Sequence, residues 1–453
     1  MNIKIKLSTA GLNLKTPRLL KRLQNPIILL LIFLLALTTR TYQLNTLPYF
    51  PQRYPWLGSN PPGLYRDETG YLKIAQNLFE NPTLYQPPLF LLFINLSLRI
   101  FSSPYSARLP SALASSITAA LIYATSKKLF KNQTAAVLSA LYYTAMTPAF
   151  IYNRMILLEN GVTPFLLAMY YSLLKYKENP KERWLYSASI LAALSTLSKI
   201  NGIIAPFFLL AYSLQKNILK KTLKPLTIAF SPLAFVAMVL ATRGSLKQWW
   251  MGMTGRETSA WQFLIINSMP SGHLPMFLGY LRPEYWYLFT YFTIAYLATK
   301  EKEKVTDTVL MILLYISLCL MMWGLGSYHL IILQPFFALP VGQAVKKMLK
   351  MHPLLTAAFI LFIYAPMTVT FNMTAFTGHP FIGFNNKIYT LKILTVGGPL
   401  TAAFWLSIKN NKTNEKRRIL LNAVTITLFL TILITGSYLI PAFYPHYFSI
   451  KNP

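Results

Sequence analysis

Long apolar runs recur along almost the whole chain, from about residue 27 to residue 441. The 453 residues are 54% hydrophobic and only 12% charged, which is more apolar than a soluble core of this length needs. About 20 apolar residues in a helix cross a hydrocarbon core of about 30 Å, so such runs predict transmembrane helices. The sequence therefore predicts an all-α polytopic membrane protein. Thirteen segments suit spanning helices: 26–44, 107–126, 133–152, 161–175, 184–198, 200–215, 223–241, 285–299, 307–325, 328–345, 353–371, 389–408 and 419–441.

Lysine and arginine residues fall in short clusters between the apolar runs. A net charge of +31 is compatible with nucleic-acid binding, but scattered clusters are typical of the cytoplasmic loops of a membrane protein. The predicted cytoplasmic segments hold 28 of the 43 basic residues, and they are 1–24, 127–132, 175–183, 216–224, 300–306, 346–352 and 409–418. The amino terminus is then inside, whereas the carboxyl terminus and the long segments 45–106 and 243–284 are outside.

This topology requires that the apolar run from Pro88 to Phe101 does not span. Its helix extends only about 21 Å, which is short of the hydrocarbon core. If it spanned, every later loop would change sides and the basic clusters would lie outside. We therefore expect an outer juxtamembrane helix here.

An acidic pair stands after the first apolar run, in "GLYRDETGYLKIAQNLF", residues 63–79. Asp67 is one of only two aspartates in the chain, and Glu68 follows it. Apolar residues at helical spacing after Asp67 predict an amphipathic helix in the membrane interface. Asp67 either caps this helix, with Glu68 complementing its positive end, or belongs to a functional site.

Further charged and polar residues fall on the same predicted outer side. Glu159, in "IYNRMILLENG", either pairs locally with Arg154 or belongs to a site, because an ionisable group here is costly unless it faces protein or water. Lys199, in "LSTLSKINGIIAPF", either reaches lipid headgroups or meets a phosphate. Tyr328 and His329, in "GSYHLIILQPFFALPVG", serve either the fold or the same site.

Six stretches, in chain order, resemble the multi-spanning glycosyltransferases of the GT-C class. The likeness is greatest to the protein O-mannosyltransferase and lipid A aminoarabinose transferase branch. The stretches are "YRDETGYLKIAQNLF", "QPPLFLLFINLSLRIF", "ARLPSALASSITAALIYATSKKLF", "YNRMILLENG", "LSKINGIIAPF" and "SYHLIILQPFFALP". The resemblance covers about residues 20–345. It implies inverting transfer of one sugar from a polyprenyl-phosphate donor to a lipid, glycan or protein acceptor at the outer face of the cell membrane.

The resemblance also implies roles for individual residues. Asp67 matches the essential acid of the first external loop, and Glu159 matches the second acidic position. Lys199, Tyr328 and His329 match the region near the lipid phosphate.

Two positions depart from the family pattern. Members often have aspartate at the position of Glu159, and histidine or lysine at that of Gln86, a predicted acceptor or sugar contact. The implied organisation is a cytoplasmic basic amino terminus (1–25), a catalytic transmembrane module (26–345) and additional carboxy-terminal helices (346–453).

Single displacement at an anomeric carbon needs a base near the acceptor hydroxyl and stabilisation of charge on the departing phosphate. Asp67, Glu68 and Glu159 form the predicted catalytic set, and Arg66 joins Lys199 in the predicted phosphate site. The scheme requires no cofactor, and the histidines show no metal-ligand spacing. A divalent cation bridging the three carboxylates is the alternative.

The external segment 243–284 contains "KQWWMGMTGRETSAWQ". Its tryptophans suit an interfacial belt. As a more specific hypothesis, Trp249 or Trp250 stacks on a sugar, and Arg256 or Glu257 contacts the acceptor.

Two other functions fit a polytopic chain with scarce charges. A transporter often carries intramembrane charge, but it also tends to show inverted repeats and a site at half depth, and the sequence shows no matching halves. An inactive scaffold with the same architecture is the second. It predicts that changing Asp67 has no effect, whereas the enzyme hypothesis predicts loss of transfer.

Overall fold

The computed structural model describes residues 18–42, 44–45, 64, 66–80, 86–242, 244–245, 285–322 and 327–351. These residues form helices and connecting turns, with no strand among them. The helices are α1 (Arg18–Thr41), α2 (Arg66–Gln76), α3 (Pro88–Ile100), η2 (Pro104–Arg108), α4 (Leu109–Phe130), α5 (Gln133–Ala145), α6 (Thr147–Tyr152), α7 (Glu159–Glu178), α8 (Glu182–Ser198), η3 (Ile200–Ile203), α9 (Ile204–Gln215), α10 (Leu219–Thr242), α14 (Tyr285–Lys300), α15 (Lys302–Met322), η4 (Ser327–Ile332) and α16 (Gln334–Met351).

Eight of the thirteen predicted spans fall entirely within the described residues, and two more, 26–44 and 307–325, do so in large part. Helices occur at all ten. The predicted spans 353–371, 389–408 and 419–441 lie outside the described residues. Judged singly by length and composition, two described stretches, Pro104–Phe130 and Leu219–Thr242, could each cross a membrane.

One predicted span divides into two α-helices. Residues 133–152 divide into α5 and α6 at Met146, because Pro148 has no N–H group to donate to the carbonyl of Thr144. Arg40 supplies the missing donor, since its Nη1 lies 3.0 Å from the Thr144 carbonyl oxygen. The break in the helix is therefore compensated by a buried arginine from α1.

The centre of the bundle consists of α4, α5, α7 and α16, in which α4 packs against the other three helices and α5 packs against α16. Gly342 of α16 lies so close to α5 that a Cβ atom there would be 1.9 Å from the Ala135 carbonyl oxygen. Ser126 and Ser139 both donate to the carbonyl of Leu339 at this contact, at 3.2 and 2.8 Å. Small residues and interhelical hydrogen bonds of this kind are typical of helix packing in membranes.

The turns with most of the described lysines lie together at one end of the bundle, which we call the lysine-rich end. Ion pairs connect its turns: Lys128 with Glu178, Lys216 with Asp307, and Lys347 with Glu301. All these residues fall in or next to segments predicted to be cytoplasmic. The structure thus brings together five of the seven segments predicted to be cytoplasmic, while the side of the membrane stays a prediction.

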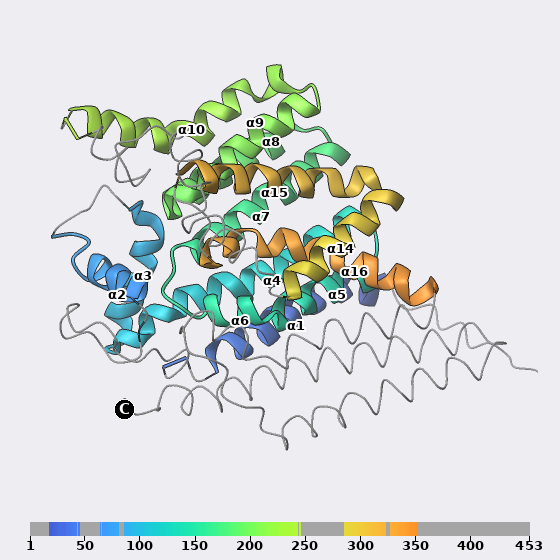
Figure 1. Cartoon of the computed structure of the whole chain (residues 1–453), viewed down its shortest axis with the longest axis horizontal. Helices are drawn as coiled ribbons and strands as arrows, with labels where there is room; N and C mark the ends of the chain where they lie inside the picture. Colours follow the sequence, from blue (N-terminus) through green and yellow to red (C-terminus); the bar gives the residue numbers. More distant parts are fainter. Residues whose placement is uncertain are drawn as a thin grey trace, which may run out of the picture.

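Helices α2 and α3 form the other end, at the left of Figure 1. Leu72 and Ala75 of α2 pack with Leu91 and Ile94 of α3, and the side-chain amide of Asn95 donates to the Ala75 carbonyl at 2.8 Å. Both helices occur where the sequence predicted an amphipathic and a juxtamembrane helix. We call this part of the molecule the α2–α3 end.

Candidate active site

The acidic pair stands in the first turn of α2, and its two side chains have different surroundings. Consecutive residues of a helix point about 100° apart. Glu68 is therefore turned into the protein and is fully buried, whereas Asp67 is partly exposed. Only one of the two predicted carboxylates is thus placed where a substrate could reach it.

Glu68 forms a buried ion pair with Arg108 of η2. Nε and Nη2 of Arg108 lie 2.8 and 2.9 Å from the two carboxylate oxygens, and both side chains have no exposed surface. The amide of Ile156 donates to the same carboxylate at 3.0 Å, and Nη1 of Arg108 donates to the carbonyl of Leu44 at 3.2 Å. This bidentate pair joins α2 to η2, to Leu44 shortly after α1 and to the loop before α7.

Glu159 and Lys199 also form an ion pair, with Nζ of Lys199 against Oε1 of Glu159. Glu159 stands in the first turn of α7, where a carboxylate complements the helix dipole. Nζ of Lys199 also donates to the hydroxyl of Tyr71 at 3.1 Å and lies 5.5 Å from the centre of that ring. Tyr71 follows Asp67 by one helical turn, so it links the pair to the helix that carries Asp67.

The backbone at the junction of α8 and η3 places Lys199 here. Lys199 is extended, with φ −159° and ψ 150°, and its carbonyl accepts from the amide of Gly202 at 2.8 Å. A Cβ atom at Gly202 would lie 2.0 Å from the carbonyl oxygen of Ser195. Only glycine fits this tight turn, which directs the lysine toward α7.

The surroundings of Tyr71 and Lys199 shift the pKa of both side chains. Burial raises the pKa of Tyr71, Lys199 lowers it, and the carboxylates of Glu159 and Asp67 raise it further. Burial lowers the pKa of Lys199, but Glu159 and Tyr71 outweigh burial and raise it above its ordinary value. Lys199 is therefore held in its charged form, and the field of Asp67 reaches the same cluster.

Two more buried arginines lie behind the cluster. Arg40 donates to the carbonyls of Thr144 and Tyr143 at 3.0 and 3.3 Å, and Arg154 donates to the carbonyl of Tyr42. The guanidinium carbons of Arg40 and Arg154 lie 5.6 and 4.7 Å from the centre of the Phe150 ring. Four cations and three carboxylates therefore lie at this end, and two ion pairs join them: Arg108 with Glu68, and Lys199 with Glu159. Arg40 and Arg154 contact backbone carbonyls and the Phe150 ring instead.

The structure places the other predicted site residues less completely. Gln86 precedes α3, is partly buried, and its side-chain oxygen has no hydrogen-bond partner among the described residues. Arg66 begins α2, but its side chain lies outside the described part. Tyr328 and His329 begin η4, again with only the backbone described, and Ile331 of η4 packs with Tyr152, Met155 and Leu157 beside Tyr71. The predicted contacts Trp249, Trp250, Arg256 and Glu257 lie outside the described residues.

The three carboxylates do not share one ligand position. Glu68 is held by Arg108 and Glu159 by Lys199, so two of the three groups that the bridging-cation alternative needs already contact different cations. Among the described residues, no group of three histidine, cysteine, aspartate or glutamate side chains is arranged to hold a metal. The prediction that no cofactor is required stays a prediction.

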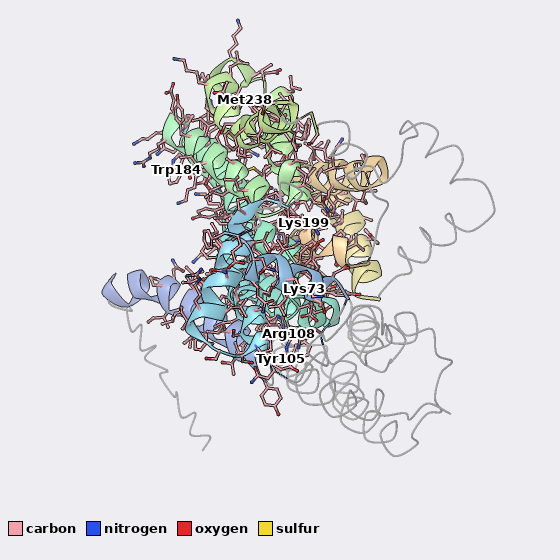
Figure 2. All side chains as sticks on the ribbon, turned by 90° about the vertical axis from the view of Figure 1, so that its left-hand side faces the viewer. Lys73, Tyr105, Arg108, Trp184, Lys199 and Met238 are labelled. Carbon is pink, nitrogen blue, oxygen red and sulfur yellow. The ribbon has the colours of Figure 1, made fainter. Side chains whose placement is uncertain are left out.

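Sequence reasoning missed Arg108, Tyr71 and Arg40, and it named Arg154 only as a local partner of Glu159. Arg108 had a visible signal, because it is an arginine inside a predicted span, in the quoted stretch "ARLPSALASS". Tyr71 was assigned only to the apolar face of the amphipathic helix. Figure 2 looks at the α2–α3 end, with Lys199 near the middle of the view and Arg108 below it.

The fold is similar to those of solved membrane proteins. The chain is similar to ArnT from Cupriavidus metallidurans bound to undecaprenyl phosphate, with a TM-score of 0.55 and 12% identity over 93% of this chain and 78% of that one. It is also similar to arabinosyltransferase EmbB from Mycobacterium smegmatis, with a TM-score of 0.50 and 12% identity over 83% of this chain and 39% of that one. These similarities confirm the predicted all-α GT-C fold.

The sequence comparison points the same way. Residues 85–244 match the family described as dolichyl-phosphate-mannose-protein mannosyltransferase. No curated protein matches the sequence. The matched residues run from the start of α3 to the end of α10 and include Arg108, Glu159 and Lys199.

Proposed function

We propose that this chain is an inverting glycosyltransferase of the cell membrane. It moves a sugar from a polyprenyl-phosphate donor to a lipid, glycan or protein acceptor at the outer face. The GT-C fold and the mannosyltransferase-family match support this class of activity. The observation that carries the assignment of the site is the partly exposed Asp67 beside the buried pair of Glu159 and Lys199.

In this mechanism Asp67 is the general base. It accepts the proton of the acceptor hydroxyl while that oxygen attacks the anomeric carbon from the face opposite the phosphate. The new bond forms as the bond between the anomeric carbon and the phosphate oxygen breaks, so the configuration inverts and the lipid phosphate departs with the electron pair. No covalent enzyme intermediate is needed.

The cations of the α2–α3 end stabilise the departing phosphate. Lys199 is kept charged by Glu159 and Tyr71, and Arg40 and Arg154 add positive potential from behind in poorly hydrated surroundings. The phosphate site is completed in this proposal by Arg66, Tyr328 and His329. Arg66 belongs to α2, as Tyr71 does, and Tyr328 and His329 belong to η4, whose Ile331 packs beside Tyr71. Gln86 and the segment with Trp249, Trp250, Arg256 and Glu257 contact sugar or acceptor.

Glu68 acts on Asp67 through the backbone in this proposal. Its bond with Arg108 fixes the first turn of α2, so Asp67 keeps one position relative to Lys199. Glu68 is thus a positioning residue within the predicted catalytic set.

The test uses membranes that contain wild-type, Asp67→Asn or Glu159→Gln protein, with labelled polyprenyl-phosphate sugars as donors. We expect Asp67→Asn to abolish transfer of label to lipid, glycan or protein at normal membrane abundance. The matched control is Glu80→Gln, an exposed acid shortly after α2, which should transfer as wild type does. Equal incorporation by wild-type and Asp67→Asn protein would refute the proposed base.

A further inference from the structure

Helix α3 has apolar residues on both sides, which a helix at the surface of a soluble protein does not have. Its inner face, including Phe90, Leu91 and Ile94, is buried against α2 and the bundle. Its outer face remains exposed: Leu92 by 39%, Leu96 by 53% and Ile100 by 62%. A contiguous apolar surface of this kind marks an interaction site.

The outer face belongs to a larger apolar surface. Phe93, Phe101 and Phe79 are also exposed, and α3 packs beside α4, whose own exposed residues are Leu113 and Ile117. Because α4 is one of the two described stretches that could cross a membrane singly, its exposed leucine and isoleucine suit lipid tails. Helix α3 therefore contacts a second helix that also has exposed apolar residues.

Arg99 stands on this apolar face with its side chain held in place. Its Nε donates to Oδ1 of Asn95 at 2.8 Å, and its guanidinium carbon lies 5.5 Å from the centre of the Phe79 ring. The Nε bond leaves the two terminal nitrogens of an exposed guanidinium directed away from Asn95, and such a fork matches two oxygens of a phosphate. Lys73 of α2 adds a second exposed cation.

We propose that the outer face of α3 is a binding surface for acidic phospholipids of the surrounding monolayer. Arg99 binds the phosphate of one headgroup, and acyl chains lie against Leu92, Leu96 and Ile100. Asn95 connects this headgroup site to α2, since its amide donates to the Ala75 carbonyl while its oxygen accepts from Arg99. The bound lipid thereby sets the depth of the helix that carries Asp67.

The first experiment measures the depth of the α3 face in nanodiscs of mixed phosphatidylcholine and phosphatidylglycerol. Cys319 is the only cysteine, so Leu96→Cys and Glu80→Cys are each made with Cys319→Ala. We expect a membrane-impermeant maleimide to label Glu80→Cys at least about tenfold faster than Leu96→Cys, because the lipid surface shields the latter. Equal labelling rates would overturn the proposal.

The second experiment identifies the headgroup by counting retained phosphatidylglycerol with native mass spectrometry. Arg99→Gln keeps a donor for Asn95 but loses the charge, and it should reduce phosphatidylglycerol retention about fivefold. Lys181→Gln, an exposed lysine at the lysine-rich end, is the control for loss of one cation elsewhere. Unchanged retention in Arg99→Gln would overturn the headgroup site. Displacement of phosphatidylglycerol by an equimolar polyprenyl phosphate would also overturn the headgroup site, because Arg99 would then bind the phosphate of the donor lipid. Neither experiment uses transfer activity, so the result is independent of the proposed function.

Discussion

The two ends of the molecule use ion pairs in opposite ways. At the α2–α3 end, Glu68 and Arg108 are completely buried, and Lys199 and Glu159 are 7% and 0% exposed. At the lysine-rich end, Lys128 and Glu178 are 17% and 46% exposed. Exposed pairs contribute little to stability, whereas loss of one partner from a buried pair is costly. Forming a buried pair also costs desolvation, so folding gains little net free energy from it. The α2–α3 end keeps such buried charges, which is expected of a site that needs charge for chemistry.

The largest effect should follow from Arg108→Met, which removes the bidentate partner of Glu68. We expect the free energy of unfolding to fall by about 3–5 kcal/mol, because a buried carboxylate loses its compensating charge. The measurement is equilibrium unfolding in detergent. The matched control is Lys304→Met at the lysine-rich end, whose pair with Glu301 is 42% exposed on the lysine side. Equal losses for the two variants would contradict the difference between the ends.

Next in size is Lys199→Met, with an expected loss of about 3 kcal/mol, at the lower end of the range for a broken buried pair. The variant Glu159→Gln combined with Lys199→Met should recover part of this loss, since it removes the buried charge as well. A double-mutant cycle measures the coupling energy. A coupling near zero would show that the pair is not formed.

Sequence reasoning found these charges but not their pairing. It placed Asp67, Glu159 and Lys199 on one side, and ten described helices occur where apolar runs predicted them. For Glu159 it could offer only the local candidate Arg154, whereas the structure pairs Glu159 with Lys199, 40 residues away.

The reason is physical. Apolar periodicity is a local property of the chain, but which cation meets which carboxylate depends on how the helices pack. Adjacent residues raise the same difficulty, because the sequence does not show that Glu68 is turned inward and Asp67 outward.

A smaller effect on stability, but a sharper one on function, is expected for Tyr71→Phe. The ring stays beneath Lys199, and only the hydroxyl bond of 3.1 Å is lost, so stability should fall by about 1 kcal/mol. If the proposed function is right, kcat should fall more than this loss of stability explains, because Tyr71 links Lys199 to the helix of Asp67.

The matched control for this prediction is Tyr171→Phe at the lysine-rich end. Nζ of Lys175 lies 5.5 Å from the centre of the Tyr171 ring, which is the same separation as between Lys199 and Tyr71. Unfolding and transfer assays on both variants separate the hydroxyl bond from the ring contact. Identical behaviour of the two variants would show that the hydroxyl of Tyr71 has no special role.

The smallest effect should come from the lysine-rich end itself. Burial raises the pKa of Glu301, but bonds from Lys347, Lys304 and Gln343 outweigh burial and lower it from 4.5 to about 2. A carboxyl group with a lowered pKa contributes stability that is present above pH 4.5 and is lost as the pH falls toward 2. Screening by water limits this contribution to less than about 1 kcal/mol. Wild-type and Glu301→Gln proteins should therefore differ slightly in melting temperature at pH 7 and converge in acid.

Because Glu68 and Glu159 are buried with their cations, the same substitution at either position should cost several times more free energy of unfolding at pH 7. A melting temperature that changes most for Glu301→Gln would reverse the comparison between the two ends.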